Sequence, residues 1–139
     1  MKNWFGDPSP SCAYAPDAVL ILPLGEPIRG PDAIERYEEG LRLAFPGGTL
    51  TVGRPVVRGD HTALEWEYRA THAGPIAIPG SVVVPPTGRP IVLRGASFLR
   101  FNAQGLIAEE HRYYDVRGLL EQLGFLERLS RPGGGPAGA

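Results

Sequence analysis

The sequence contains a single cysteine, Cys12, among its 139 residues. One cysteine cannot form an internal disulfide, which excludes a small secreted scaffold held together by disulfides and favours a reducing, intracellular environment. Cys12 lies in a proline-rich segment without a partner that would activate it, so we do not expect it to act as a nucleophile. The cytoplasm is the expected location.

Neither basic nor acidic residues are in clear excess. The 14 basic and 15 acidic residues leave a formal net charge of −1. Because duplex binding depends on a cationic surface, this balance argues against a nucleic-acid partner.

Long apolar runs are absent as well. No segment approaches the length of a membrane span, and "NWFGDPSPS" after Lys2 is not the apolar core of a signal peptide. The three histidines lack metal-ligand spacing, and no glycine-rich loop joins a strand to a helix as a phosphate site requires. The sequence therefore predicts no membrane association, no metal and no cofactor.

The residues that are present suit one globular domain. Hydrophobic residues make up 42% of the chain and charged residues 21%, ordinary values for a domain of this size. We expect residues 1–16 to be irregular, residues 17–130 to form the domain, and residues 131–139, "RPGGGPAGA", to form a disordered tail.

Hydrophobic periodicity predicts one long amphipathic helix, a second helical run and several strands. The helix covers residues 32–45, begins after Pro31 and ends at "PGG". Its apolar stripe consists of Ile34, Tyr37, Leu41 and Ala44, and its other side of Glu35, Arg36, Glu38, Glu39 and Arg42. Tight turns at 58–61 and 102–105 favour antiparallel hairpins, and the longer connection at 73–89 has room for an extra ribbon. This order of elements predicts an α+β fold with a continuous antiparallel sheet. The expected strands are 17–23, 49–57, 62–72, 90–101 and 105–115, and the second helical run is 116–129.

The heptapeptide "EEHRYYD", residues 109–115, is polar throughout. Alternation along a strand places Glu109, His111, Tyr113 and Asp115 on one face and Glu110, Arg112 and Tyr114 on the other. Since neither face is apolar, we expect one of them to border a polar cavity.

Five segments together resemble the SnoaL-like polyketide cyclases, also called ester cyclases, of the NTF2-like superfamily that includes ketosteroid isomerase. These segments are "YAPDAV", "PIRGPDAIERY", "ALEWEYRATHAGPI", "PPTGRPIVLRGASFLRF" and "GLIAEEHRYYDVRGLLEQLG". The resemblance implies a cone-shaped α+β fold, in which a curved antiparallel sheet carries helices on its concave side around an apolar pocket. Relatives begin with a long helix, which is expected to be shortened or missing here.

The resemblance also implies an enzyme that performs cofactor-free acid–base chemistry, either intramolecular aldol cyclisation or isomerisation, on a polyketide- or steroid-like carbonyl compound. It places the acidic residue of this group at Asp115, in "D-x-x-x-LL-x-QLG". Burial in an apolar pocket would raise the pKa of such a carboxyl group and make it a better base, as the aspartate base of ketosteroid isomerase illustrates. The alternative is a non-catalytic binding or assembly domain, because this fold hosts both.

The expected site extends from Asp115 along the sheet. A substrate lying along the wall would meet Asp115 as base and His111 or Tyr113 as hydrogen-bond donor to the developing enolate. The remaining candidates for substrate contact are the aromatic residues Trp66, Tyr68 and Phe98, together with His72 of the "TH-x-G" motif.

Structural explanations remain open for each candidate. Asp115 could cap the helix that follows it, and His111 could be a hydrogen-bonding residue at the pocket or surface. Trp66 and Tyr68 could belong to the core, and His72 could have a structural role. Arg94 and Arg100 could pair with glutamates across the sheet or bind an anionic substrate.

We expect a homodimer. Superfamily members commonly pair through the outer face of the sheet, and the thin wall left by a missing first helix would expose apolar surface.

Overall fold

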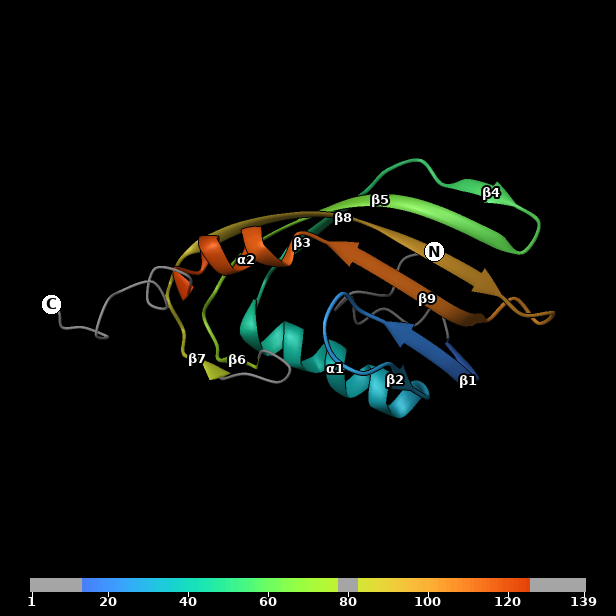
Figure 1. Cartoon of the computed structure of the whole chain (residues 1–139), viewed down its shortest axis with the longest axis horizontal. Coiled ribbons are helices and arrows are strands. Elements are labelled where there is room, and N and C mark those ends of the chain that lie inside the picture. The colour runs from blue at the N-terminus through green and yellow to red at the C-terminus, as the bar shows by residue number, and fades with distance from the viewer. Residues whose placement is uncertain (1–13, 78–82, 126–139) are drawn as a thin grey trace, which may run out of the picture.

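A computed structural model describes residues 14–77 and 83–125 (Figure 1). Of the segment at 1–16 that was expected to be irregular, residues 1–13 lie outside the described residues, and residues 14–16 belong to a strand. The expected disordered tail at 131–139 also lies outside the described residues. Strand β1 covers Tyr14–Ile21, so it begins three residues earlier than the periodicity predicted. No helix precedes β1 within the described residues.

A curved sheet forms the main layer, with the strand order β2-β1-β9-β8-β5-β3 and with β4 also paired to β5. The α+β fold is confirmed. The sheet is mixed rather than wholly antiparallel, because β1 runs parallel to β9. These two strands lie far apart in the sequence, so no hairpin dictates their relative direction. The other strands are β2 (Ile28–Arg29), β3 (Thr49–Val52), β4 (Val56–Arg58), β5 (His61–Thr71), β8 (Pro90–Phe101) and β9 (Ile107–Tyr114).

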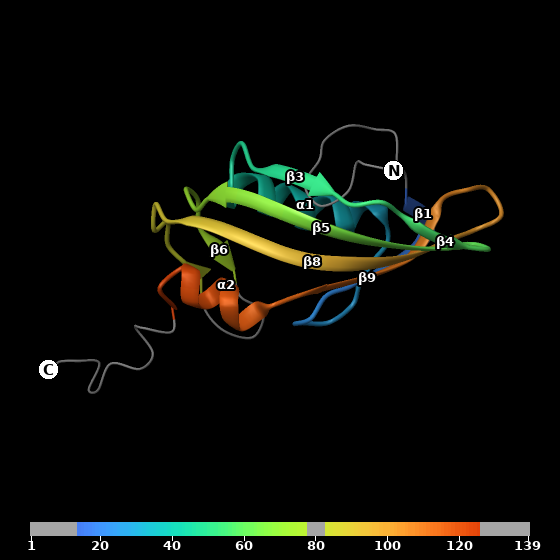
Figure 2. The same cartoon turned by 90° about the horizontal axis from the view of Figure 1, so that it is seen from above.

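Both helices lie on the concave side of the sheet (Figures 1 and 2). Helix α1 covers Pro31–Ala44, with proline in its first turn where no intrahelical donor is needed. Helix α2 covers Val116–Gln122, and residues 126–129 of the predicted helical run lie outside the described residues. The long connection carries the expected ribbon, formed by β6 (Ile76–Ala77) and β7 (Val83–Val84).

Alternation along β5 and β8 builds the core. On β5, Leu64, Trp66 and Tyr68 are buried while the residues between them are less covered. On β8, Leu93 and Leu99 face the same side and contribute to the same cluster. Each large apolar side chain buried in this way contributes about 1.5–3 kcal/mol, which fixes which face of the sheet the helices cover.

One residue of α1 departs from the predicted pattern. Glu38 was expected on the polar side of the helix, yet it is buried, as is Ile34 one turn earlier. Glu38 faces inward because its carboxylate pairs with the buried Arg112 of the sheet.

Candidate functional site

A cavity of about 430 Å³ opens between α1 and the concave side of the sheet. This volume falls within the usual range for small-molecule sites. Apolar side chains dominate its wall, and the only polar side chains that the described residues place there are three tyrosines and Arg36. The apolar residues are Leu22, Leu24, Leu41, Phe45, Pro75, Ile76, Ala77, Ile91, Leu93, Val116, Leu119 and Leu120.

Helix α2 forms one wall because two features fix its position. The Asp115 side chain caps the helix by accepting a hydrogen bond from Gly118 N at 2.9 Å. At the other end, the Gln122 amide pairs with the backbone of Val92 on β8, accepting from its nitrogen at 2.7 Å and donating to its oxygen at 2.9 Å. Gln122 thus pairs with β8 as a neighbouring strand would, and holds Leu119 against the cavity.

Two phenols form the central polar feature of the cavity. Tyr37 on α1 and Tyr114 at the end of β9 both line it, and each side chain is close enough to influence the pKa of the other. Burial raises the pKa of both phenols, that of Tyr37 to well above its ordinary value. The interaction between the two hydroxyls adds to the effect of burial on the pKa of Tyr37 and partly offsets the effect of burial on the pKa of Tyr114.

Tyr68 is the third phenol in the wall. Its hydroxyl lies 3.4 Å from the carbonyl oxygen of Phe45, and the two rings meet edge to face. Burial raises the pKa of Tyr68 as well. All three phenols are therefore neutral near pH 7 and can offer hydrogen bonds but not charge.

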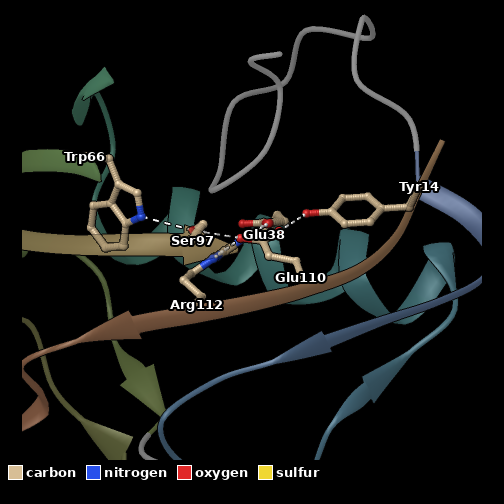
Figure 3. A network of polar contacts seen from close by, with 6 residues as sticks. All are labelled: Tyr14, Glu38, Trp66, Ser97, Glu110 and Arg112. Carbon is tan, nitrogen blue, oxygen red and sulfur yellow. Dashed lines mark hydrogen bonds and ion pairs between the residues drawn. The ribbon is translucent and has the colours of Figure 1, made fainter. Parts of the chain in front are cut away.

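Beside the cavity lies a buried ionic network centred on Arg112 (Figure 3). The Arg112 guanidinium donates to Glu110 at 2.8 Å and to Glu38 on α1 at 3.0 Å. Glu110 also accepts from the Tyr14 hydroxyl at 2.7 Å and from Ser97 at 3.2 Å. The network thus ties β1, α1, β8 and β9 together.

Burial alone would lower the pKa of Arg112, but the carboxylates of Glu110 and Glu38 outweigh it and raise the pKa well above its ordinary value. Arg112 therefore stays cationic inside the protein. Its charge also lowers the pKa of the neighbouring phenols of Tyr37 and Tyr114, partly opposing the effect of burial. Both carboxylates pair with Arg112, and we assign the network a role in holding the fold together. Neither Glu38 nor Glu110 is among the residues that line the cavity.

Among the predicted site residues, Trp66, Tyr68 and His72 face inward. Only Tyr68 lines the cavity. Trp66 belongs to the core, where its indole N–H donates to Ser97 Oγ at 3.1 Å. His72 is fully buried, and its Nδ1 accepts from the backbone N–H of Thr87 at 3.2 Å. His72 thus joins the end of β5 to the segment before β8, a structural role.

Phe98, His111 and Tyr113 lie on the outer face of the sheet. Their contact with a substrate stays a prediction, and this geometry does not support it. Phe98 pairs directly with His111 across the strands, and Phe98 and Tyr113 are 50% and 53% exposed. Their rings meet edge to face at 5.9 Å. The inner face belongs to Glu110, Arg112 and Tyr114 because these residues align with the inward positions of β8.

Asp115 is exposed, and its carboxylate caps α2 rather than pointing into the cavity. Tyr114 and Val116, on either side of it, both line the cavity. The backbone therefore passes the site while the carboxylate turns away. The role of Asp115 as a base stays a prediction, and this geometry does not support it.

The arginines considered as substrate anchors form ion pairs on the outer face. Arg94 lies 3.4 Å from Glu67, and Arg100 lies 3.4 Å from Glu109. Both side chains are therefore partners of glutamates, as the structural explanation required.

Neither Tyr37 nor Tyr114 was predicted as a site residue from the sequence. Tyr37 was assigned to the apolar stripe of α1, and a tyrosine in a helical stripe is usually core. One signal was available for the network: Glu110 and Arg112 have opposite charges two residues apart on a strand, so they can neutralise each other on a buried face. Glu38, four residues after Ile34, also falls on the buried stripe of the helix.

Membrane spans and metal sites are both missing from the described residues. No helix in this part of the chain is long and apolar enough to cross a membrane. Within residues 14–77 and 83–125, no group of three or more histidine, cysteine, aspartate or glutamate side chains is placed to hold a metal ion.

Comparisons with known proteins agree on the fold. The profile of the SnoaL-like domain matches residues 12–110. IdmH from Streptomyces antibioticus, a candidate polyketide cyclase, is 32% identical with a TM-score of 0.62, over 81% of this chain and 82% of its own. AclR from Streptomyces galilaeus, a candidate hydroxylase, is 30% identical with a TM-score of 0.63, over 80% and 66%.

A candidate SnoaL-like polyketide cyclase from Jannaschia sp. superposes with a TM-score of 0.71 at 18% identity, over 80% of this chain and 73% of its own. At that identity the likeness concerns the fold alone. No curated protein sequence matches the chain significantly.

Proposed function

Because the chain belongs to the SnoaL-like domain family, we propose that it binds a hydrophobic, ring-bearing carbonyl compound in the cavity between α1 and the sheet. The observation that carries this proposal is the apolar cavity of about 430 Å³ with two neighbouring phenols in its wall. Apolar walls bind rings, and a few polar groups orient them.

Tyr114 is the group suited to bind the carbonyl oxygen. It lines the cavity and lies close enough to Arg112 for that charge to lower its pKa and partly offset the effect of burial. A nearby cation makes a phenol more acidic and therefore a stronger hydrogen-bond donor. A ligand carbonyl in reach of Tyr114 would therefore replace water as its acceptor.

The binding function is tested with acetonaphthone, a two-ring methyl ketone, and with ethylnaphthalene, which lacks the oxygen. Tyr114→Phe removes the donor and keeps the ring, so affinity for acetonaphthone should fall about two- to tenfold, the usual value of one hydrogen bond. Affinity for ethylnaphthalene should stay the same. Titration calorimetry measures both, and Tyr113→Phe on the outer face is the matched control. Failure of the wild-type protein to bind either compound would refute the proposal.

A second candidate function is turnover, by cofactor-free enolisation followed by aldol cyclisation or isomerisation. The phenol pair favours it, because a neutral donor at the carbonyl oxygen stabilises a developing enolate. Among the described residues, no carboxylate lines the cavity, so the base would have to be Asp115 after release from its role as helix cap. The likeness to candidate polyketide cyclases supports this candidate, and the position of the Asp115 carboxylate opposes it.

Exchange of the methyl protons of acetonaphthone in deuterium oxide separates the two functions. An enolising enzyme accelerates this exchange, and Asp115→Asn should abolish the acceleration while leaving α2 capped, because asparagine is an equally good cap. Nuclear magnetic resonance follows the methyl signal. Binding without accelerated exchange would show that the protein binds the ketone but does not catalyse its enolisation.

We also propose that two copies pair through the outer face of the sheet. Phe98 and Tyr113 place an exposed aromatic pair at its centre, and Val56 lies on the same rung as Phe98 with 69% exposure. Two ion pairs, Arg94 with Glu67 and Arg100 with Glu109, flank this patch. A twofold arrangement can therefore place an arginine of one copy opposite a glutamate of the other. Light scattering should report a dimer that Phe98→Ser converts to a monomer; a monomeric wild-type protein at every concentration would refute this.

A further inference from the structure

The mouth of the cavity lies where its lining residues are exposed. Five of the lining residues are exposed, and they come from the segment after β1, from α1, and from the segment after β5. Four of these carry no charge. The exposed lining residues are Leu24, Arg36, Gly40, Pro75 and Ala77.

Arg36 is the only charged side chain that the described residues contribute to the cavity wall. Within the same part of the chain no ion pair involves it, although Asp32 lies one helical turn earlier. Arg42 on the same helix behaves differently, since Glu35 and Glu39 both accept from it. Two glutamates of the helix thus neutralise Arg42, which lies away from the cavity. Among the described residues, no carboxylate pairs with Arg36 at the mouth.

Gly40, one turn after Arg36, also lines the cavity. A glycine inside a helix costs about 0.5–1 kcal/mol relative to alanine, so its presence at mid-helix requires a reason. Packing against the protein is not that reason, because a Cβ atom added at Gly40 would meet no atom within 4 Å. Helical side chains lean toward the N-terminus, so a side chain at Gly40 would occupy the space beside Arg36. Glycine keeps that space open.

From these observations, and resting on the proposed binding function, we infer that the ligand carries a carboxylate, which Arg36 binds at the mouth of the cavity in the space left by Gly40. The rings of the ligand occupy the apolar interior. An arginine guanidinium presents two parallel N–H groups that match the two oxygens of a carboxylate. The class of ligand is therefore a hydrophobic ring compound bearing both an acid and a carbonyl or hydroxyl group.

The test compares naphthoate with acetonaphthone, which differ only in having a carboxylate or a methyl ketone on the same ring carbon. Calorimetry at low ionic strength and neutral pH gives the ratio of the two dissociation constants. Arg36→Gln should reduce the preference for naphthoate by about tenfold, because one charge-assisted pair at a partly exposed site is lost. Arg42→Gln, a charge change of the same size on the same helix, should leave the ratio unchanged.

Gly40→Ala provides an independent variant that the protein should tolerate. It should raise the free energy of unfolding while weakening the binding of naphthoate, because the added methyl group favours the helix and fills ligand space. An unchanged preference in Arg36→Gln, or unchanged naphthoate affinity in Gly40→Ala, would overturn this inference and leave the proposed function intact. Absence of binding of either compound to the wild-type protein would overturn both.

Discussion

Glu110 and Arg112 alternate with Glu109 and His111 along β9, and the two faces of this strand hold similar groups in opposite surroundings. On the inner face, neither side chain is exposed, and contacts from β1, α1 and β8 complete the network (Figure 3). On the outer face, Glu109 pairs with His111 at 3.1 Å while each side chain keeps about a third of its surface exposed.

The comparison indicates that burial determines how much a pair of polar side chains contributes to the stability of the fold. Water can replace any partner of the outer pair, so that pair contributes little to stability. The inner groups have lost water entirely and depend on one another, so removal of one leaves the others uncompensated. The inner face therefore behaves as an anchor of the fold, and the outer face is free for association.

The largest effect is expected from Arg112→Met, which removes the central cation and keeps a long side chain. Glu110 and Glu38 would remain buried without their counter-ion, and the free energy of unfolding should fall by about 3–5 kcal/mol. Urea denaturation measures the loss. His111→Gln on the outer face is the control and should change stability by less than about 0.5 kcal/mol; similar losses in both variants would refute the contrast.

Tyr14→Phe should have the next largest effect. The variant keeps the ring and removes the hydroxyl that donates to Glu110, so a buried carboxylate loses one hydrogen bond. The expected loss is about 1–3 kcal/mol. Tyr113→Phe, the equivalent change on the outer face, should be neutral in the same denaturation experiment, and a comparable loss there would argue against the role of burial.

Asp115, at the end of the same strand, should show an intermediate effect that depends on the substituent. Asp115→Ala removes the cap of α2 and should cost about 1 kcal/mol, whereas Asp115→Asn should cost a few tenths at most. Thermal unfolding of the two variants compares them directly. Equal stability of the two would mean that the hydrogen bond to Gly118 contributes nothing.

The smallest effect is expected from Glu109→Gln. The hydrogen bond from His111 lowers the pKa of Glu109, so its contribution is present above the ordinary pKa of glutamate and is lost as the pH falls through the lowered value. Because Glu109 is about a third exposed, the loss of stability near pH 7 should not exceed about 0.5 kcal/mol. It should disappear at acid pH, once Glu109 is protonated in both the folded and the unfolded state, and a larger loss at acid pH would contradict this sign.

Much of the fold could be predicted from the sequence because local patterns determine it. Residues 90–101 were predicted as a strand with the observed bounds, and helix α1 was placed within one residue at each end. In both segments, apolar periodicity and a flanking proline or glycine act together. The parallel contact of β1 with β9 could not be predicted this way, since no local pattern records which distant strand will be a neighbour.

The site was harder to predict for a different reason. Both faces of residues 109–115 are polar, so alternation alone does not reveal which one is buried. The answer depends on partners from elsewhere in the chain: Glu38 on α1 and Tyr14 on β1 make the Arg112 face the inner one. Tyr37 and Tyr114 meet only once that choice is made, and so the phenol pair could not be derived from the sequence.

The bond between Tyr14 and Glu110 joins residues 96 positions apart. During synthesis, the first strand leaves the ribosome long before its principal neighbour exists, and until then the two-residue β2 is its only partner within the described sheet. Such distant pairing makes folding slow and leaves an apolar edge open meanwhile. Until β9 has been synthesised, β1 of a nascent chain therefore lacks its principal partner strand. At that stage its unpaired edge is most prone to associate with other chains.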